Sequence, residues 1–297
     1  MHRLASLAEG GRKEETVGTL LGALARRLAA LQAPVEEARE ILAAVLDVPR
    51  HWPKLHGDDC VEGEVWRRAC IAADRRAAGA PMQYAVGQAC FRKLTLDVDE
   101  RVLIPRPETE LLVDLVLERC TRGTVADVGT GSGAIAVALA TEGAYERVIA
   151  TDISSDALDV ARANAARYAG VTKAEMTFVH ADLLTSSAIG FPLSAVVSNP
   201  PYISYNEIGD LPAAVRDWEP AIALLSADDG MATTRRLVQQ AADHLVAGGL
   251  LALEVDARRA SLVAELVARD DRYERISVLL DLAGRERFLL ATRREQR

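Results

Sequence analysis

The sequence predicts an α/β fold, in which helices wrap a mostly parallel β-sheet and a small helical bundle comes first. From residue 124 onward, short apolar runs alternate with amphipathic segments, as strands and helices do in a parallel sheet. Residues 16–80 instead carry apolar side chains at three- and four-residue steps, which is typical of helices. The chain has 297 residues, enough for two such parts.

The composition is that of an ordinary globular protein, with 49% hydrophobic and 26% charged residues. No window approaches about 18 uncharged apolar residues, so we expect no membrane span. The first residues, MHRLASLAEGGRKEE, lack the apolar core of a secretory signal. We therefore expect a flexible tail over residues 1–15 and a cytoplasmic protein.

Neither a metal site nor direct binding to nucleic acid is expected. The four cysteines have no CxxC spacing and the five histidines form no ligand pattern. The net charge is −8, whereas nucleic-acid binders usually carry a basic excess that neutralises phosphates.

The N-terminal part, residues 16–80, is predicted to be a helical bundle. Apolar residues before and after the break at Pro34 predict its first two helices: Val17, Leu20, Leu21, Leu24, Leu28, Leu31, then Val35, Ala38, Ile41, Leu42, Val45, Leu46. A third helix is predicted over 60–78, and HWPKLHG at 51–57 is loop-like. Because the bundle holds no chemical site, we interpret it as a substrate-docking domain.

A β-hairpin linker is predicted over residues 81–106, where apolar side chains alternate after Pro81. The catalytic domain is predicted over 107–297 and opens with the helical run LLVDLVLERC. Further helices are expected at 134–140 and 154–170. Strands are expected at 125–128, 147–152, 176–182, 195–201 and 250–256, followed by RISVLLD and RFLLATR, which LAGRE connects.

A glycine-rich loop follows the first strand of the catalytic domain and opens a helix. Glycines let the backbone turn sharply and approach a ligand, and a helix start offers free N–H groups to it. Asp152 ends the next strand, where a carboxylate can accept hydrogen bonds from ribose hydroxyls. A nucleoside-bearing cofactor is therefore predicted, held by Gly129, Thr130, Gly131, Ser132, Gly133 and Asp152.

The glycines alone do not identify the cofactor, since GTGSGA also fits a loose dinucleotide pattern or a tight structural turn. Their strict alternation favours S-adenosylmethionine, as does Asp127 ahead of them, which could help hold an ammonium group. Asp182 and Leu183 end the third strand, where a carboxylate can approach the adenine amino group and an apolar side chain can cover its ring.

Asn199-Pro200-Pro201-Tyr202 follows the fourth strand and predicts a receptor for a planar –NH2 group. The Asn199 side-chain oxygen and the Pro200 carbonyl can each accept one N–H. The two prolines cannot continue the strand and make the loop rigid. Tyr202 offers a flat face for stacking. An Asn-Pro-Pro turn beside a core tyrosine is the structural alternative.

Such a receptor would orient a poorly nucleophilic nitrogen toward a sulfonium methyl group and withdraw it from water. No strong base is needed first, because the proton can leave during or after methyl transfer. Catalysis is therefore assigned to Asn199, Pro200 and Tyr202, with Pro201 as a further substrate contact and Asn199 also touching the cofactor.

Four stretches, together with DVGTGSG, resemble the HemK/PrmC family, the peptide chain release factor N5-glutamine methyltransferases. They are PMQYAVGQACFRKLTLDVDERVLIPRPETELLVD (81–114), NPPYI (199–203), EPAIAL (219–224) and DLAGRERF (281–288). The resemblance covers roughly residues 16–292. IPRPETE is its most specific part, since it separates the family from DNA adenine methyltransferases that share NPPY.

The resemblance implies a class I S-adenosylmethionine-dependent methyltransferase, with a Rossmann-like, mostly parallel seven-stranded sheet. It implies S-adenosylmethionine as donor and S-adenosylhomocysteine as product. The implied substrate is the glutamine in the Gly-Gly-Gln loop of class 1 release factors, in support of translation termination. A monomer is expected. Phe91, Pro105 and Glu108 would line the cleft beside the linker, and Arg106 would be structural.

The sequence departs from the family at LEVDARRA (253–260), where many members carry a glycine after the Leu-Glu pair. Substrate contacts at this strand end are therefore expected to differ. Two other functions stay open on the residues alone. One is methylation of N6-adenine or another nucleic-acid amino group by the same NPPY site. The other is a non-catalytic adaptor that binds S-adenosylmethionine.

Overall fold

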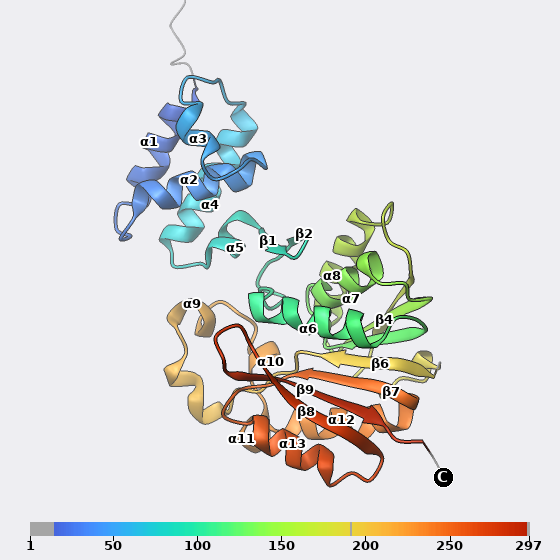
Figure 1. The fold of residues 1–297 in the computed structure, drawn as a ribbon. Helices are drawn as coiled ribbons and strands as arrows, with labels where there is room; N and C mark the ends of the chain where they lie inside the picture. Colours follow the sequence, from blue (N-terminus) through green and yellow to red (C-terminus); the bar gives the residue numbers. More distant parts are fainter. Residues whose placement is uncertain (1–14, 191, 296–297) are drawn as a thin grey trace, which may run out of the picture. The chain divides into compact units, whose positions relative to one another are not determined.

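The computed structural model describes residues 15–190 and 192–295, and its chain divides into two compact units, Met1–Val86 and Gly87–Arg297 (Figure 1). The predicted flexible tail lies outside the described residues, apart from residue 15. The two units are described separately below. None of the helices within the described ranges is both long and apolar enough to cross a bilayer.

The first unit is a helical bundle, as predicted. Its helices are α1 (Val17–Arg27), α2 (Pro34–Leu46), α3 (Trp52–Leu55), α4 (Gly63–Ala77) and α5 (Met82–Val86). Thr16 caps α1 through a reciprocal pair of hydrogen bonds with Thr19, and Pro34 starts α2, where a missing N–H costs nothing. The core of the bundle comes from one face of α1, α2 and α4.

Val35 belongs to α2 as predicted, although it lies in the first turn of the helix and is 43% exposed. Two sequence predictions in this unit were wrong in detail. The stretch 51–57 contains the helical turn α3, in which the Trp52 and His56 rings stack at 4.0 Å. Residues 82–86 form α5 and no strand. Apolar alternation over five residues does not distinguish a helical turn from a strand.

The second unit opens with a two-stranded antiparallel hairpin, β1 (Gln88–Phe91) and β2 (Leu94–Asp97). A seven-stranded sheet follows, in the order β5-β4-β3-β6-β7-β9-β8. Its strands are β3 (Thr124–Val128), β4 (Arg147–Asp152), β5 (Glu175–His180), β6 (Leu193–Ser198), β7 (Leu245–Glu254), β8 (Tyr273–Leu280) and β9 (Glu286–Arg293). β3 to β7 run parallel, and β9 runs antiparallel to both of its neighbours, β7 and β8, so that β8 has the same direction as β3 to β7. This confirms a mostly parallel sheet.

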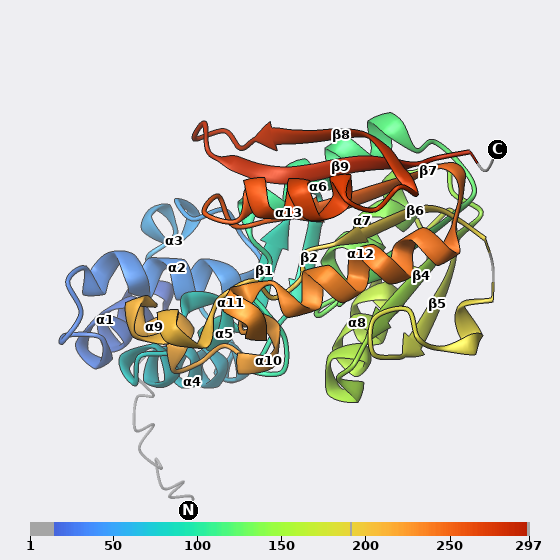
Figure 2. The same ribbon diagram turned by 90° about the horizontal axis from the view of Figure 1, so that it is seen from below.

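Helices cover both faces of this sheet (Figure 2). α6 (Pro107–Arg119), α7 (Ala134–Glu142) and α8 (Ser155–Arg167) pack on one face, and α12 (Ala232–His244) and α13 (Ala260–Ala268) pack on the other. Successive residues of a strand pack on opposite faces of the sheet. Val196 of β6 packs toward α12, while Ala195 and Val197 pack toward α7. The strand is therefore buried on both sides, as its continuous apolar run predicts.

The strand order reverses beside β3, which pairs with β4 on one side and β6 on the other. Ligands of open parallel sheets bind beyond the carboxyl ends of the strands at such a point. Short elements follow β5 and β6: η1 (Ser187–Ile189), η2 (Tyr205–Asp210), α9 (Ala213–Arg216), α10 (Ala221–Leu224) and α11 (Ala227–Gly230). The fold therefore brings the glycine loop and Asn199 to neighbouring strand ends.

Candidate active site

Two cavities adjoin beyond the carboxyl ends of β3 and β6. The larger has a volume of about 250 Å³ and is lined by Gly129, Gly131, Asp152, Asp182 and Leu183 among others. The smaller, of about 100 Å³, is lined by Arg106, Pro200, Tyr202 and Ile203 among others. Both cavities share four wall residues, namely Leu103, Asn199, Pro201 and Ala223. Ligands in the two cavities would therefore contact the same four residues.

The glycine loop adopts a backbone that only glycine accepts readily. Gly129, Gly131 and Gly133 have φ values of 73°, 54° and 82°. A Cβ atom built on Gly129 or Gly131 would meet no protein atom within 4 Å, so the space above the loop is open to a ligand. A Cβ on Gly133 would lie 3.2 Å from the Ala161 backbone, so this glycine permits close packing of α7 on α8.

Asp127 lies beneath this loop and not on the wall of the larger cavity. Its Oδ2 accepts hydrogen bonds from Thr130 Oγ1 at 2.6 Å and from the Ala136 N–H at 3.0 Å. Its Oδ1 is buried and has no hydrogen-bond partner among the described residues. Burial raises the pKa of Asp127 to about 7. Asp127 thus fixes the loop from below.

Thr130 and Ser132 also point inward. Their exposed fractions are 6% and 3%. The Thr130 hydroxyl bonds to Asp127, and the Ser132 carbonyl accepts from Asn164 Nδ2 at 2.8 Å. The Thr130 side chain therefore supports the loop, the Ser132 backbone carbonyl is held by Asn164, and neither residue is among those that line the larger cavity. Their assignment as cofactor ligands stays a prediction.

Asp152 holds the glycine loop from the next strand. Its Oδ2 accepts from the Gly131 N–H and its Oδ1 from the Ser154 N–H, both at 2.9 Å. Burial raises the pKa of this carboxyl, and the two backbone hydrogen bonds oppose that effect. Since the residue also lines the larger cavity, its carboxylate is held rigidly where a hydroxyl-bearing ligand could reach it.

Asp182 and Leu183 line the far part of the same cavity. Asp182 Oδ2 lies 2.6 Å from a terminal nitrogen of Arg236, and both side chains are about half exposed. Leu183 has a φ of 58°, which is rare for a residue with a side chain. Both residues thus line the same cavity, and their contact with a common ligand stays a prediction.

The Asn-Pro-Pro-Tyr segment separates the two cavities. Asn199 and Pro201 line both, while Pro200 and Tyr202 line the smaller one. The Ser198 hydroxyl donates to the Val128 carbonyl at 2.6 Å, which ties the end of β6 to the end of β3. Burial raises the pKa of Tyr202 to about 12, so the ring stays neutral.

Behind Asn199 lies a buried hydrogen-bonded chain that sequence reasoning missed. Asn199 Nδ2 donates to Thr109 Oγ1 at 3.2 Å, and Thr109 Oγ1 donates to Glu254 Oε2 at 2.7 Å. Glu254 is 2% exposed, and burial raises its pKa to about 7. One signal was available, because Glu254 ends the apolar run LLALE, where a carboxylate needs a partner.

The stretch LEVDARRA (253–260), where the sequence departs from the family pattern, forms part of an ion-pair cluster. Arg259 is 8% exposed; its guanidinium lies 2.7 Å from Glu207 and 2.9 Å from Asp256, and its Nε donates to the Asp229 carbonyl. Glu207 belongs to η2, which follows the Asn-Pro-Pro-Tyr segment. This stretch therefore braces the loop after the cavities, and no local pattern in the sequence indicates it.

Gly230 completes that brace. Its φ is 84°, and it follows Asp228 and Asp229, whose φ values are also positive. A Cβ on Gly230 would lie 2.2 Å from the Tyr202 carbonyl oxygen and 2.8 Å from Arg259 Nε. Only glycine fits beneath Tyr202.

The predicted cleft residues beside the linker do not meet at either cavity. Phe91 is fully buried in the core under α6 and α7, so its prediction as a cleft residue was wrong. Among the described residues that line the cavities, neither Pro105 nor Glu108 appears. Arg106 lines the smaller cavity and pairs with buried Glu219 at 2.5 Å, consistent with the structural role expected of it.

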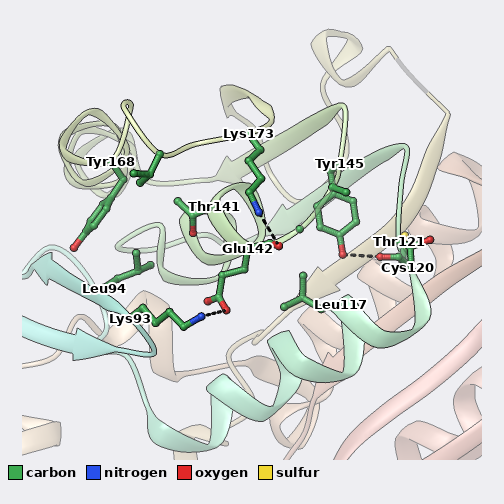
Figure 3. Close-up of a pocket in the computed structure, with 13 residues that line it drawn as sticks. Lys93, Leu94, Leu117, Cys120, Thr121, Thr141, Glu142, Tyr145, Tyr168 and Lys173 are labelled. Carbon is green, nitrogen blue, oxygen red and sulfur yellow. Dashed lines mark hydrogen bonds and ion pairs between the residues drawn. The ribbon is translucent and has the colours of Figure 1, made fainter.

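Another cavity, of about 550 Å³, lies at the other end of α7, roughly 13 Å from the glycine loop along the helix. Its polar groups face one another (Figure 3). Lys93 Nζ lies 3.9 Å from Glu142 Oε2, Lys173 Nζ donates to the Glu142 carbonyl, and the Tyr145 hydroxyl donates to the Cys120 carbonyl. It lies apart from the strand ends that carry the site.

Family models match both units. Residues 19–87 match the PrmC N-terminal domain, and residues 107–211 match the methyltransferase small domain. Among solved structures, a methyltransferase from Pyrococcus furiosus superposes with a TM-score of 0.50 at 18% identity, over 69% of this chain and 91% of that one. This likeness supports the fold alone.

Curated relatives are more similar to this chain in sequence than that solved structure is. The release factor glutamine methyltransferase of Moorella thermoacetica is 43% identical, over 95% of this chain and all of the relative. That of Gloeobacter violaceus is 40% identical, over 84% of this chain and 87% of the relative. Together with the matched domains, these identities confirm the resemblance: the chain belongs to the family of release factor glutamine methyltransferases.

Proposed function

We propose that this enzyme transfers a methyl group from S-adenosylmethionine to the side-chain nitrogen of the glutamine in the Gly-Gly-Gln loop of class 1 release factors. The observation that carries the proposal is the shared wall of the two cavities, formed in part by Asn199 and Pro201. A donor in the larger cavity and an amide in the smaller one would meet across these residues.

The larger cavity suits S-adenosylmethionine by its residues. The open space above Gly129 and Gly131 admits a ligand close to the backbone. Asp152 offers carboxylate oxygens to ribose hydroxyls, and Asp182 and Leu183 offer an acceptor and an apolar cover to adenine. When bound, the cofactor supplies an electrophilic methyl group on a sulfonium. Asp127, which is buried beneath the glycine loop, is proposed to act on this site through the loop that it holds.

The smaller cavity suits a carboxamide. Asn199 Oδ1 and the Pro200 carbonyl can accept the two N–H bonds of the amide, and the Tyr202 ring can lie against its plane. An amide nitrogen is a poor nucleophile, so orientation and removal from water are what these residues contribute. Neutral Tyr202 adds no charge to the site.

The N-terminal unit is proposed to dock the release factor, residues 81–106 to link the parts, and residues 107–297 to carry out catalysis. We propose a monomer that acts in the cytoplasm, where translation ends. The net charge of −8 suits a basic protein loop better than it suits nucleic acid. Methylation of a nucleic-acid amino group is not favoured, because the similar relatives are named for release factors.

The proposal is tested by incubating the protein with radiolabelled S-adenosylmethionine and a purified class 1 release factor. We expect label in the wild-type release factor and none in a matched release factor whose Gly-Gly-Gln glutamine is replaced by alanine. Absence of label from both, with cofactor binding verified by calorimetry, would refute the proposed substrate.

Replacing Asp152 by asparagine is expected to weaken binding of S-adenosylmethionine by about tenfold. Asparagine has one acceptor, so it leaves either the Gly131 or the Ser154 N–H without its partner and has no charge for the ribose. Isothermal titration calorimetry measures the change. Asp156→Asn, on the exposed surface of α8, is the control and should bind as wild type. Equal affinity of Asp152→Asn and wild type would contradict the assignment.

A further inference from the structure

We infer that Thr109 is a positioning residue which, with Glu254 behind it, determines which end of the Asn199 amide faces the smaller cavity. The inference rests on the proposed function, because its consequence falls on the methyl transfer.

The three residues come from distant parts of the chain. Thr109 lies in the first turn of α6, Asn199 follows β6, and Glu254 is the last residue of β7. Thr109 and Glu254 are both buried. The contacts are 3.2 Å from Asn199 to Thr109 and 2.7 Å from Thr109 to Glu254. Burial excludes water as a substitute partner for the Thr109 hydroxyl.

The chain has a direction, because an ionised carboxylate can only accept hydrogen bonds. Glu254 therefore accepts a hydrogen bond from the Thr109 hydroxyl, and the Thr109 oxygen is left as an acceptor. Only the –NH2 end of Asn199 can satisfy that acceptor. Its Oδ1 must then point the other way, toward the cavities that Asn199 lines.

This direction is what the proposed reaction needs. An asparagine amide has nearly the same shape in both orientations, so shape alone cannot select one. In the flipped orientation Asn199 would present –NH2 to the –NH2 of the substrate, and the cavity would lose one of its two acceptors. The Thr109 hydroxyl thus selects the orientation that receives an amide nitrogen.

The protonation of Glu254 can reverse the chain. A protonated Glu254 can donate to Thr109, whose hydroxyl is then free to donate to Asn199 Oδ1. Burial raises the pKa of Glu254 to about 7. Four neighbouring groups also act on this pKa: Thr109, Arg287 and Arg106 lower it, and Glu108 raises it. The receptive orientation therefore holds above this pKa and is lost as the pH falls through it.

The tyrosine of the Asn-Pro-Pro-Tyr segment is the other titratable group that interacts with this carboxyl. Burial and then the charge of Glu254 raise the pKa of Tyr202 to about 12. Tyr202 therefore stays neutral throughout the range in which Glu254 titrates. A change of activity near neutral pH therefore does not report on Tyr202. Because burial also raises the pKa of Asp127 to about 7, comparison with Glu254→Gln assigns such a change to Glu254.

The test compares Thr109→Val with Thr109→Ser. Valine keeps the shape without the hydroxyl, and serine keeps the hydroxyl. We expect Thr109→Val to lower kcat for the release factor about tenfold, with the Kd of S-adenosylmethionine unchanged, and Thr109→Ser to recover most of the activity. Equal kcat for the two variants would overturn the inference, and would leave the proposed function standing if wild type is active.

Glu254→Gln provides a second readout, which decides the matter if Thr109→Val does not fold. The ratio of kcat at pH 8 to kcat at pH 6 is expected to be larger in wild type than in Glu254→Gln, because the variant has no carboxyl to protonate. The same ratio in both proteins would overturn the inference.

A spectroscopic test separates this inference from the proposed function. The ¹⁵N side-chain resonance of Asn199, assigned by its loss in Asn199→Ala, is expected to move between pH 6 and pH 8 in wild type and to stay fixed in Glu254→Gln. This holds whether or not a release factor is methylated. A resonance that changes neither with pH nor on substitution would contradict the proposed hydrogen-bonded chain.

Discussion

Replacing Asn199 by alanine is expected to lower the rate of release-factor methylation by about 10²- to 10³-fold. The variant removes one of the two acceptors that orient the amide nitrogen, and it leaves the Thr109 hydroxyl without its donor. Single-turnover kinetics at saturating cofactor measure the loss at the methyl-transfer step. We expect the free energy of unfolding to change far less, since Asn199 is only partly buried.

Asn206→Ala is the matched control for that substitution. Asn206 is an exposed asparagine in η2, four residues after Tyr202. Its replacement is expected to leave the rate within about twofold of wild type, because surface substitutions away from a site have small effects. A normal rate in Asn199→Ala, with the cofactor bound, would mean that another group orients the substrate.

Replacing Gly230 by alanine is expected to lower the free energy of unfolding by about 3 kcal/mol. The added Cβ would lie 2.2 Å from the Tyr202 carbonyl oxygen, on a backbone whose φ of 84° disfavours a side chain. The loop that carries Tyr202 must shift to relieve this contact, so methylation is expected to fall as well. Urea denaturation, followed by circular dichroism, measures the stability.

Gly170→Ala is the control for the Gly230 variant. A Cβ at Gly170 meets no atom within 4 Å, and its φ lies outside the positive range that disfavours side chains. We expect the control to be neutral or slightly stabilising, because alanine restricts the unfolded chain. Equal stabilities for the two variants would show that the contact between Gly230 and Tyr202 does not constrain the loop.

Much of the fold follows from local patterns in the sequence. β4 was predicted at the bounds that the structure has, since RVIATD is a short apolar run that ends in an acidic residue. The parallel sheet followed from the alternation of such runs with helices. The N-terminal helices followed from their apolar spacing, because each buries a single face.

The details of the site were less predictable, because they depend on residues far apart in the chain. The contact of Thr109 with Glu254 spans 145 positions, and that of Asn199 with Thr109 spans 90. No local pattern reports such pairs. The glycine loop and the Asn-Pro-Pro-Tyr segment could be predicted because each consists of consecutive residues that form a recognisable motif. Thr130 and Ser132 belong to that same loop, yet their side chains turn inward.

The central claim is that Asn199 Oδ1 and the Pro200 carbonyl together receive the amide nitrogen of the substrate. A crystal structure of the protein with S-adenosylhomocysteine and a Gly-Gly-Gln peptide tests it most directly. We predict that the glutamine nitrogen lies about 3 Å from both oxygens and faces the cofactor sulfur. A glutamine held elsewhere, or an Asn199 oxygen turned toward Thr109, would contradict the account.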